Sequence, residues 1–193
     1  VLGGGIGMLI GLIAGYKEGL FDNIVMRIGD VQMGVPFILL ALIILAIMGG
    51  GVDKLIIVLA LQSWVPYARV VRGETLKLKN QDFVEASRAQ GSSDLRIMIK
   101  HILPNLLAPN IILGSFSVAQ TIEREAALSF LGLGVGADVA SWGGILATGR
   151  DYIVEAWWIA ALPGIAIVIT VLSINVIGDW FRDYLDPRNV EQR

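Results

Sequence analysis

Long stretches without a charged residue alternate along the chain with short stretches that carry most of its charge. The uncharged stretches are Val1–Tyr16, Val31–Val52, Leu55–Ala68, Ile102–Ile122 and Ala156–Gly178. A helix that crosses the hydrocarbon core of a bilayer needs about 20 apolar residues, and the second, fourth and fifth stretches reach that length. The pattern therefore predicts an all-α polytopic membrane protein with about five transmembrane helices.

The two remaining stretches are shorter. Leu55–Ala68 has charged side chains at its ends, Lys54 and Arg69, which can reach opposite interfaces and lengthen the segment enough to span. A buried re-entrant segment is the alternative for it. The first stretch begins at Val1 without an initiator Met, a basic region or a cleavage site. We therefore expect it to be a span that follows a missing N-terminal piece, and not a signal peptide.

Composition agrees with a membrane protein and argues against several other classes. Hydrophobic residues make up 55% of the chain and charged residues 17%, and the mean hydropathy is +0.69. The net charge of −2 does not indicate a nucleic-acid partner. The chain has no cysteine and a single histidine, His101, so we expect neither a metal site nor a catalytic nucleophile–histidine set.

Basic residues indicate which side of the membrane each loop faces. If all five stretches span, then residues 17–30, 69–101 and 179–193 lie on the same side. Cytoplasmic loops are enriched in lysine and arginine, so this side is predicted to be cytoplasmic, including the tail 179–193. The basic residues on it, 12 of 15, are Lys17, Arg27, Arg69, Arg72, Lys77, Lys79, Arg88, Arg96, Lys100, Arg182, Arg188 and Arg193.

Glycines recur every four residues in the first stretch, at Gly3, Gly7, Gly11 and Gly15. This spacing places them on one face of a helix, where the backbone of a second helix can approach closely. We expect this face to pack inside a helix bundle, and lining of a substrate path is the alternative.

The segment 69–101 contrasts with its surroundings because it holds 11 charged side chains. At about 2.5 kcal/mol or more per charge at the bilayer centre, its burial in lipid would cost well over about 20 kcal/mol. The segment must therefore lie in water or against a soluble protein.

Local signals in this segment predict two short helices. Asn80 is suited to cap the first helix, over Gln81–Gln90, and Gly91 is suited to end it in a left-handed conformation. A serine at 92 or 93 then caps the second helix, which we expect to end as Pro104 approaches. The first helix is too short to be stable alone in water. It needs a groove in a partner protein or, as the alternative, the lipid headgroups to lie on.

The same residues resemble the EAA loop of permease subunits in ABC importers, whose pattern is EAA, three residues, Gly, nine residues and then I-x-L-P. The chain departs from this pattern at Ser87, where Ala is usual, and at His101, which takes the Ile position. Both departures resemble the peptide and nickel branch of these permeases. The chain matches the pattern at Glu85, Ala86, Gly91, Leu103 and Pro104.

The resemblance covers nearly the whole chain. WVPYARVVRGE (Trp64–Glu74), ALSFLGLG (Ala127–Gly134), SWG (Ser141–Gly143) and GDWFRDYLDPR (Gly178–Arg188) are similar to the later part of C-type permease subunits for dipeptides and oligopeptides. The first transmembrane helix of that family is not represented. The resemblance implies the type I importer permease fold, with residues 1–193 as one transmembrane domain in a bacterial or archaeal cytoplasmic (inner) membrane.

The resemblance further implies that the EAA loop is a coupling helix, which docks in a cleft of an ATP-binding subunit. The implied partners are a second homologous permease subunit, two cytoplasmic ATP-binding subunits, an extracytoplasmic substrate-binding protein and membrane lipid. ATP and Mg²⁺ would be held by the partner subunits, and this chain, which lacks a G-x-x-x-x-G-K-[ST] loop, is expected to bind no cofactor and to be no enzyme. The expected ATPase-subunit interface is Glu85, Ala86, Ser87, Arg88, Gly91 and Asp94, with Leu103 and Pro104 at the exit of the loop.

Charged residues 123–125 interrupt the fourth stretch. Charges within a span usually face a cavity or pair with each other. Glu125 is the candidate for the translocation pathway, where its carboxylate would meet a peptide amino terminus or Ni²⁺, and a structural ion pair or a contact with the partner permease is the alternative. The resemblance favours import of di- or oligopeptides, with nickel as the nearest alternative. A secondary transporter working without ATP would show inverted repeats or broken spans, and no internal repeat is evident in the sequence. A membrane scaffold whose charged segment recruits a cytoplasmic protein is a third class.

Aromatic residues mark two further regions. Trp142, Trp157 and Trp158 are suited to the outer bilayer interface or to docking of the substrate-binding protein. In the tail, the apolar positions 180, 181, 184 and 185 share one helical face, which predicts a helix along the inner interface that ends at Pro187.

Overall fold

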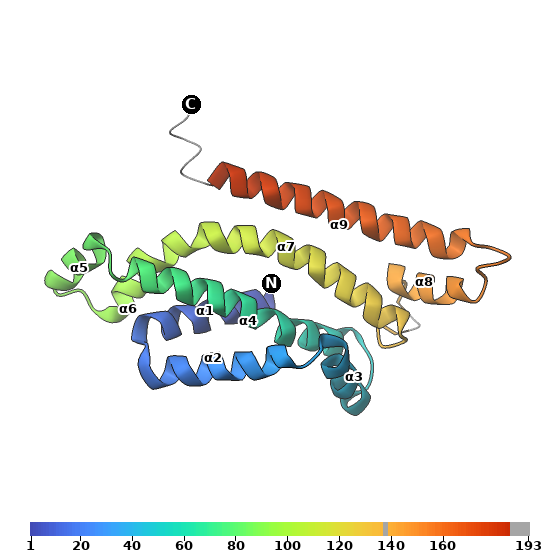
Figure 1. Cartoon of the computed structure of the whole chain (residues 1–193), viewed down its shortest axis with the longest axis horizontal. Coiled ribbons are helices and arrows are strands. Elements are labelled where there is room, and N and C mark those ends of the chain that lie inside the picture. The colour runs from blue at the N-terminus through green and yellow to red at the C-terminus, as the bar shows by residue number, and fades with distance from the viewer. Residues whose placement is uncertain (137–138, 186–193) are drawn as a thin grey trace. The chain divides into compact units, whose positions relative to one another are not determined.

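The structure is a computed structural model that describes residues 1–136 and 139–185 (Figure 1). All regular secondary structure in these residues is helical, so the predicted all-α fold is confirmed. The elements are α1 (Leu2–Lys17), α2 (Gly19–Gly34), α3 (Phe37–Met48), α4 (Val52–Leu78), α5 (Asp82–Ala89), α6 (Asp94–Ile97), the π-helix η1 (Met98–Ile102), α7 (Leu103–Phe130), α8 (Trp142–Arg150) and α9 (Trp158–Leu185).

Three helices in the described residues are long and apolar enough to cross a bilayer on their own, Val52–Leu78, Asp94–Phe130 and Trp158–Tyr184. α2 and α3 pass the same test only together, as a broken pair, and α1 is a shorter apolar helix. The described residues thus hold three helices that could span alone, or up to four spans if the bent pair counts as one, which is fewer than the five predicted. The five uncharged stretches fall in α1, the α2–α3 pair, α4, α7 and α9. The short stretch Leu55–Ala68 lies wholly within α4, so the re-entrant alternative is not supported.

The second predicted span, Val31–Val52, is not one helix, and this prediction was wrong. α2 ends at Gly34 and α3 begins at Phe37. Pro36 explains the break, because it has no backbone N–H and it disfavours the helical conformation in the residue before it. Pro36 itself is extended, with φ −55° and ψ 129°. The predicted loop 17–30 is also wrong, since most of it belongs to α2.

The chain divides into two compact units. Of the described residues, the first contains 1–34, 63–114 and 184–185, and the second contains 35–62, 115–136 and 139–183. Each unit has a hydrophobic core of its own. The segment that resembles the EAA loop lies entirely in the first unit.

In the first unit, α1 packs its glycine face directly on the backbone of α4. A Cβ atom on Gly11 would lie 2.9 Å from Cα of Ala68, and a Cβ on Gly7 would lie 3.0 Å from the carbonyl carbon of Trp64. Gly15 repeats the contact one turn further along both helices. The contacts advance by four residues on each helix, so α1 and this part of α4 run parallel. The predicted close packing of the glycine face is confirmed.

α2 is joined to α4 by ion pairs. Arg72 donates to both carboxylate oxygens of Asp22, with Nη2 2.6 Å from Oδ2, and Arg69 pairs with Asp30. The Asp22 side chain is only 6% exposed. A buried carboxylate requires such a partner, so the Asp22–Arg72 pair fixes the position of α2 along α4. Both arginines lie within α4, so the charged segment that begins at residue 69 starts as the last part of this helix.

The core of the first unit joins the long helices to the segment that resembles the EAA loop. Burial of an aliphatic side chain contributes about 1.5–3 kcal/mol, so this core stabilises α5, which has only 8 residues. The core side chains come from α1, α4, α5 and the helix from Asp94 onward: Leu12, Tyr16, Val71, Val84, Ile97, Met98, Ile102 and Leu106.

In the second unit, glycines of α8 contact α7 and α9. A Cβ on Gly143 would lie 2.7 Å from Cα of Ala126, and one on Gly149 would lie 2.6 Å from the backbone nitrogen of Ala160. Ser141 caps α8 by accepting a hydrogen bond from the Gly144 N–H. A separate core supports this unit, formed by Ala41, Leu45, Leu55, Val58 and Leu128.

Candidate functional site

The first helix of the predicted coupling segment is α5, Asp82–Ala89, which agrees with the expected range to within one residue at each end. Its N-cap is Gln81, and Asn80 instead donates from Nδ2 to the Leu76 carbonyl oxygen at 3.1 Å, so the prediction of Asn80 as the cap was wrong. Gly91 has φ +79° and turns the chain after α5, as predicted.

The second helix of the segment begins after Ser93 and does not end at Pro104. α6, η1 and α7 form one continuous helix from Asp94 to Phe130, so this part of the prediction was wrong. The π-turn explains how the proline is accommodated, because the Leu103 N–H bonds to the Met98 carbonyl, one residue further back than in an α-helix. Asn105 Nδ2 then donates to the His101 carbonyl oxygen at 2.6 Å.

α5 has an inner and an outer face. Val84 is fully buried and Ser87 is 8% exposed, with the Ser87 hydroxyl 3.2 Å from Nε2 of His101. Glu85 and Ala86 are exposed on the outer face. The residues expected at the partner interface therefore lie on two faces of α5. Ser87 is on the buried face, whereas Glu85 and Ala86 are on the exposed face.

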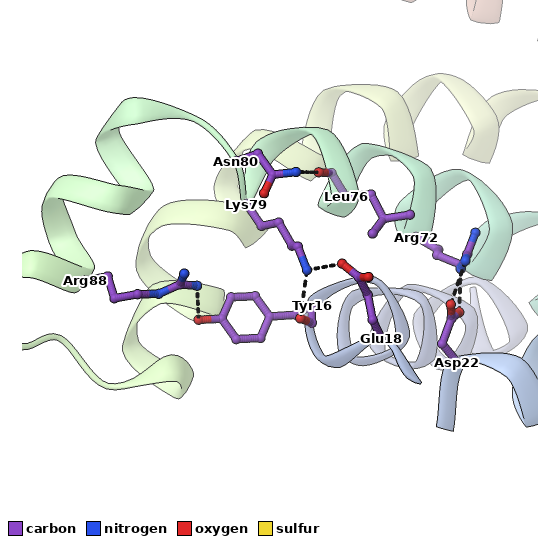
Figure 2. A network of polar contacts seen from close by, with 8 residues as sticks. All are labelled: Tyr16, Glu18, Asp22, Arg72, Leu76, Lys79, Asn80 and Arg88. Atoms are coloured by element: carbon purple, nitrogen blue, oxygen red, sulfur yellow. Dashed lines mark hydrogen bonds and ion pairs between the residues drawn. The ribbon is translucent and has the colours of Figure 1, made fainter. Parts of the chain in front are cut away.

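Arg88 and Asp94, on the two sides of the Gly91 turn, both reach Tyr16 at the end of α1. The Tyr16 hydroxyl donates to Asp94 Oδ1 at 2.6 Å, and Arg88 Nη2 lies 3.4 Å from the same hydroxyl oxygen. The hydrogen bond with Tyr16 raises the pKa of the Arg88 guanidinium above its ordinary value. Figure 2 shows Arg88 and the Tyr16 ring pointing toward each other from different helices.

Lys79 forms a second polar contact with the end of α1 (Figure 2). It pairs with Glu18 and lies 3.5 Å from the Tyr16 carbonyl oxygen, which ties the residue after α4 to the end of α1. Tyr16 and Glu18, which contribute to this site, were not predicted from the sequence. Their position directly after the glycine face, at the predicted cytoplasmic end of the first span, was the available signal.

The charged residues 123–125 lie on α7 in the second unit. Glu125 accepts a hydrogen bond from the Ser129 hydroxyl at 2.6 Å. Arg124 donates to Gln120 at 3.2 Å, and its guanidinium lies 5.4 Å from the centre of the Phe37 ring. Within the described residues Arg124 forms no salt bridge. The Glu125 carboxylate is thus oriented along its own helix and retains free acceptor positions.

The aromatic residues at the predicted outer interface are exposed. Trp142 begins α8, Trp157 directly precedes α9 and Trp158 begins it, and the ring centres of Trp157 and Trp158 lie 6.1 Å apart. At the other end, α9 continues to Leu185, so the first part of the predicted tail extends the long helix. The predicted end at Pro187, and Arg188 and Arg193, lie outside the described residues.

These features define a class: an all-helical protein with several helices long and apolar enough to cross a membrane and a charged segment between two of them. The family model described as binding-protein-dependent transport system inner membrane component matches residues 7–191, and the chain belongs to this family.

Relatives and a solved structure agree with this assignment. The chain is 49% identical to a peptide transport system permease protein of Brucella suis over 97% of its length, and 42% identical to the di/tripeptide permease DppC of Pseudomonas aeruginosa over 94%. It is 43% identical to the glutathione permease GsiD of Escherichia coli over 97%. The chain spans 63%, 60% and 62% of these relatives.

A chain in the solved structure of the MetNI methionine ABC transporter, in inward facing conformations, has the same fold, with a TM-score of 0.70 at 23% sequence identity. The match covers 96% of the present chain and 91% of the other. The type I importer permease fold is thereby shown.

Proposed function

We propose that the chain is a permease subunit of an ATP-binding-cassette importer and that it moves di- or oligopeptides across the cytoplasmic membrane by alternating access. The observation that carries the proposal is the arrangement of α5. Its outer face presents Glu85 and Ala86, whereas Val84 on the inner face anchors it in the core shared with α1 and α7. A helix with this arrangement can receive a force from a partner and pass it to the membrane helices.

The ATP-binding subunits grip α5 on the cytoplasmic side. Glu85, Arg88 and Asp94 supply the charges of the docking group, Ala86 allows a close approach because it is small, and Gly91 provides the turn. The hydrogen bond between the Ser87 hydroxyl and His101 holds α5 against the helix that begins at Asp94. ATP is hydrolysed by the partner subunits, and their closure moves α5 and rocks the permease between inward-open and outward-open states.

The force reaches the membrane through one continuous helix. Because Asp94–Phe130 is continuous, a displacement at the Gly91 turn is carried past Leu103 and Pro104 into α7 without a break in the helix. The helix from Trp158 onward runs back toward the cytoplasmic side, which also receives the C-terminus in this proposal.

Family membership and the relatives support the proposal of a second permease subunit, an extracytoplasmic substrate-binding protein and a peptide cargo. The names of the three relatives specify peptides or glutathione, which favours a peptide over nickel. The binding protein docks on the outer side, where Trp142 and Trp157 are exposed. Glu125 contributes a carboxylate to the translocation pathway, where it meets the cationic amino terminus of the peptide.

Reconstitution of the complete complex in vesicles tests the proposal. We expect ATP-driven uptake of a radiolabelled dipeptide, and Glu85→Lys abolishes it while the chain still inserts and accumulates. The matched control is Asp179→Lys, which reverses another exposed carboxylate outside the coupling segment and away from the proposed docking surface of the binding protein. Uptake of radioactive Ni²⁺ without dipeptide uptake would support the nickel alternative, and full uptake by Glu85→Lys would contradict the coupling role.

A further inference from the structure

We propose that Tyr16 is a positioning residue whose hydroxyl forms hydrogen bonds with both helices of the coupling segment and so holds them to the end of α1. We call this pair of hydrogen bonds, from Tyr16 to Asp94 and from Arg88 to Tyr16, the clasp. The inference rests on the proposed function and extends it, because it gives the coupling segment a second connection to the membrane helices. The first connection is covalent and runs through η1 into α7. The second is the hydrogen-bonded contact at Tyr16.

The clasp bridges the Gly91 turn with one oxygen atom. Arg88 lies in α5, before the turn, and Asp94 begins α6, after it. The Tyr16 hydroxyl donates to Asp94 at 2.6 Å and accepts from Arg88 at 3.4 Å. The shorter bond joins a phenol to a carboxylate, which is a charge-assisted and therefore strong hydrogen bond. The position of α1 thus depends on the angle between the two coupling helices.

The Tyr16 ring is held rigidly, so its hydroxyl has a fixed direction. The side chain is 8% exposed and belongs to the core that contains Val84 of α5 and Ile97 of α6. A ring buried against both helices cannot swing away from them without opening the core. The arrangement therefore links α1 to the coupling segment through packing and through hydrogen bonds at once.

The end of α1 is fixed from the other side as well. Glu18 has φ +51°, a left-handed conformation that is unfavourable for a residue with a side chain and persists where surrounding contacts determine it. Its carboxylate pairs with Lys79, which follows α4. Because the glycine face of α1 also contacts the α4 backbone, a displacement received at Tyr16 moves α1 and α4 together.

The first test measures the number of peptides imported per ATP hydrolysed by the complete complex in vesicles, with radiolabelled Ala-Ala as the probe. Tyr16→Phe removes only the hydroxyl, and we expect ATP hydrolysis to continue while the ratio falls about tenfold, which corresponds to about 1.4 kcal/mol. Tyr67→Phe is the matched control, since it removes the same atom from a ring that packs on Gly4 of α1. An unchanged ratio in Tyr16→Phe would overturn the clasp.

A double-mutant cycle separates the clasp from a general loss of stability. Asp94→Ala removes the acceptor from an exposed position, and we expect it to lower the same ratio. If the two groups act through one bond, the double variant is no worse than the more affected single variant. Fully independent effects would contradict the proposal.

A distance measurement tests the clasp even if peptide uptake fails. The chain has no cysteine, so spin labels can be placed through Leu20→Cys and Leu95→Cys, two exposed positions in α2 and α6. We expect one narrow distance distribution in the complex, with and without ATP, that broadens in Tyr16→Phe. An identical distribution in the variant would overturn the clasp. Absence of ATP-driven uptake by the unmodified complex would refute the proposed function instead.

Discussion

A single methyl group added to the glycine face of α1 should separate two helices that now touch at their backbones. In Gly11→Ala the new Cβ would lie 2.9 Å from Cα of Ala68. Carbon atoms pack favourably at about 3.5–4.0 Å, so α1 and α4 must move apart locally by about 0.6–1.1 Å. Overpacking of this kind costs about 1–3 kcal/mol. The obstacle is backbone, which cannot rotate aside as a side chain can.

The same helix provides a matched control. Gly5 lies on the opposite face, and a Cβ there would have no neighbour within 4 Å. Alanine is preferred over glycine in a helix interior by up to about 1 kcal/mol, and both variants receive this benefit. The difference in the free energy of unfolding between Gly11→Ala and Gly5→Ala therefore isolates the packing cost, expected at about 1–3 kcal/mol.

Thermal unfolding of the purified protein in one detergent measures this difference. For a chain of this size, 1 kcal/mol corresponds to about 2–4 °C in Tm, so Gly11→Ala should melt about 2–12 °C below Gly5→Ala. Gly7→Ala should behave like Gly11→Ala. If Gly11→Ala is as stable as Gly5→Ala, then α1 and α4 are not in backbone contact and the packing described for the first unit is incorrect.

Three further predictions concern single side chains. Arg72→Ala leaves the buried Asp22 carboxylate unpaired, so the free energy of unfolding should fall by about 3–5 kcal/mol, and an unchanged Tm would argue against the pair. Gly91→Val places a β-branched residue at φ +79° and should abolish ATP-driven peptide uptake while membrane insertion persists; normal uptake would show that the turn is dispensable. Glu125→Gln should lower peptide uptake, and if the uptake rate is unchanged, Glu125 has no part in the pathway.

Features that depend on short stretches of sequence could be predicted. The glycine spacing of α1, the left-handed Gly91 and the limits of α5 each follow from residues within a turn or two of one another. Pro36 is a local signal for a helix break, but the prediction of one span over Val31–Val52 relied on the absence of charge in that stretch. Hydropathy reports where a segment is apolar and does not report whether it is one helix.

The continuation of the helix through Pro104 was harder to predict. A proline usually ends or kinks a helix because it lacks a donor. Here the π-turn over Met98–Ile102 shifts the hydrogen-bond pattern by one residue, and Asn105 satisfies the His101 carbonyl. The compensation depends on several residues acting together, which motif spacing alone does not show.

Contacts between distant parts of the chain could not be predicted from the sequence. Tyr16 and Asp94 are 78 residues apart, and Asp22 and Arg72 are 50 apart. The motif identified Asp94 as a functional residue, but no local pattern indicated that its side chain is bound by a tyrosine of the first helix. Such pairs are set by how the helices pack, which a single sequence does not determine.

Cysteine crosslinking between α5 and the ATP-binding subunit tests the central claim most directly. Because the chain has no cysteine, single variants such as Glu85→Cys, Ala86→Cys and Val84→Cys each introduce a unique thiol. The account predicts that the exposed positions 85 and 86 crosslink to a thiol placed in the cleft of the ATP-binding subunit, and that the buried position 84 does not. If neither exposed position forms a crosslink in a complex that hydrolyses ATP and imports peptide, α5 is not the coupling helix.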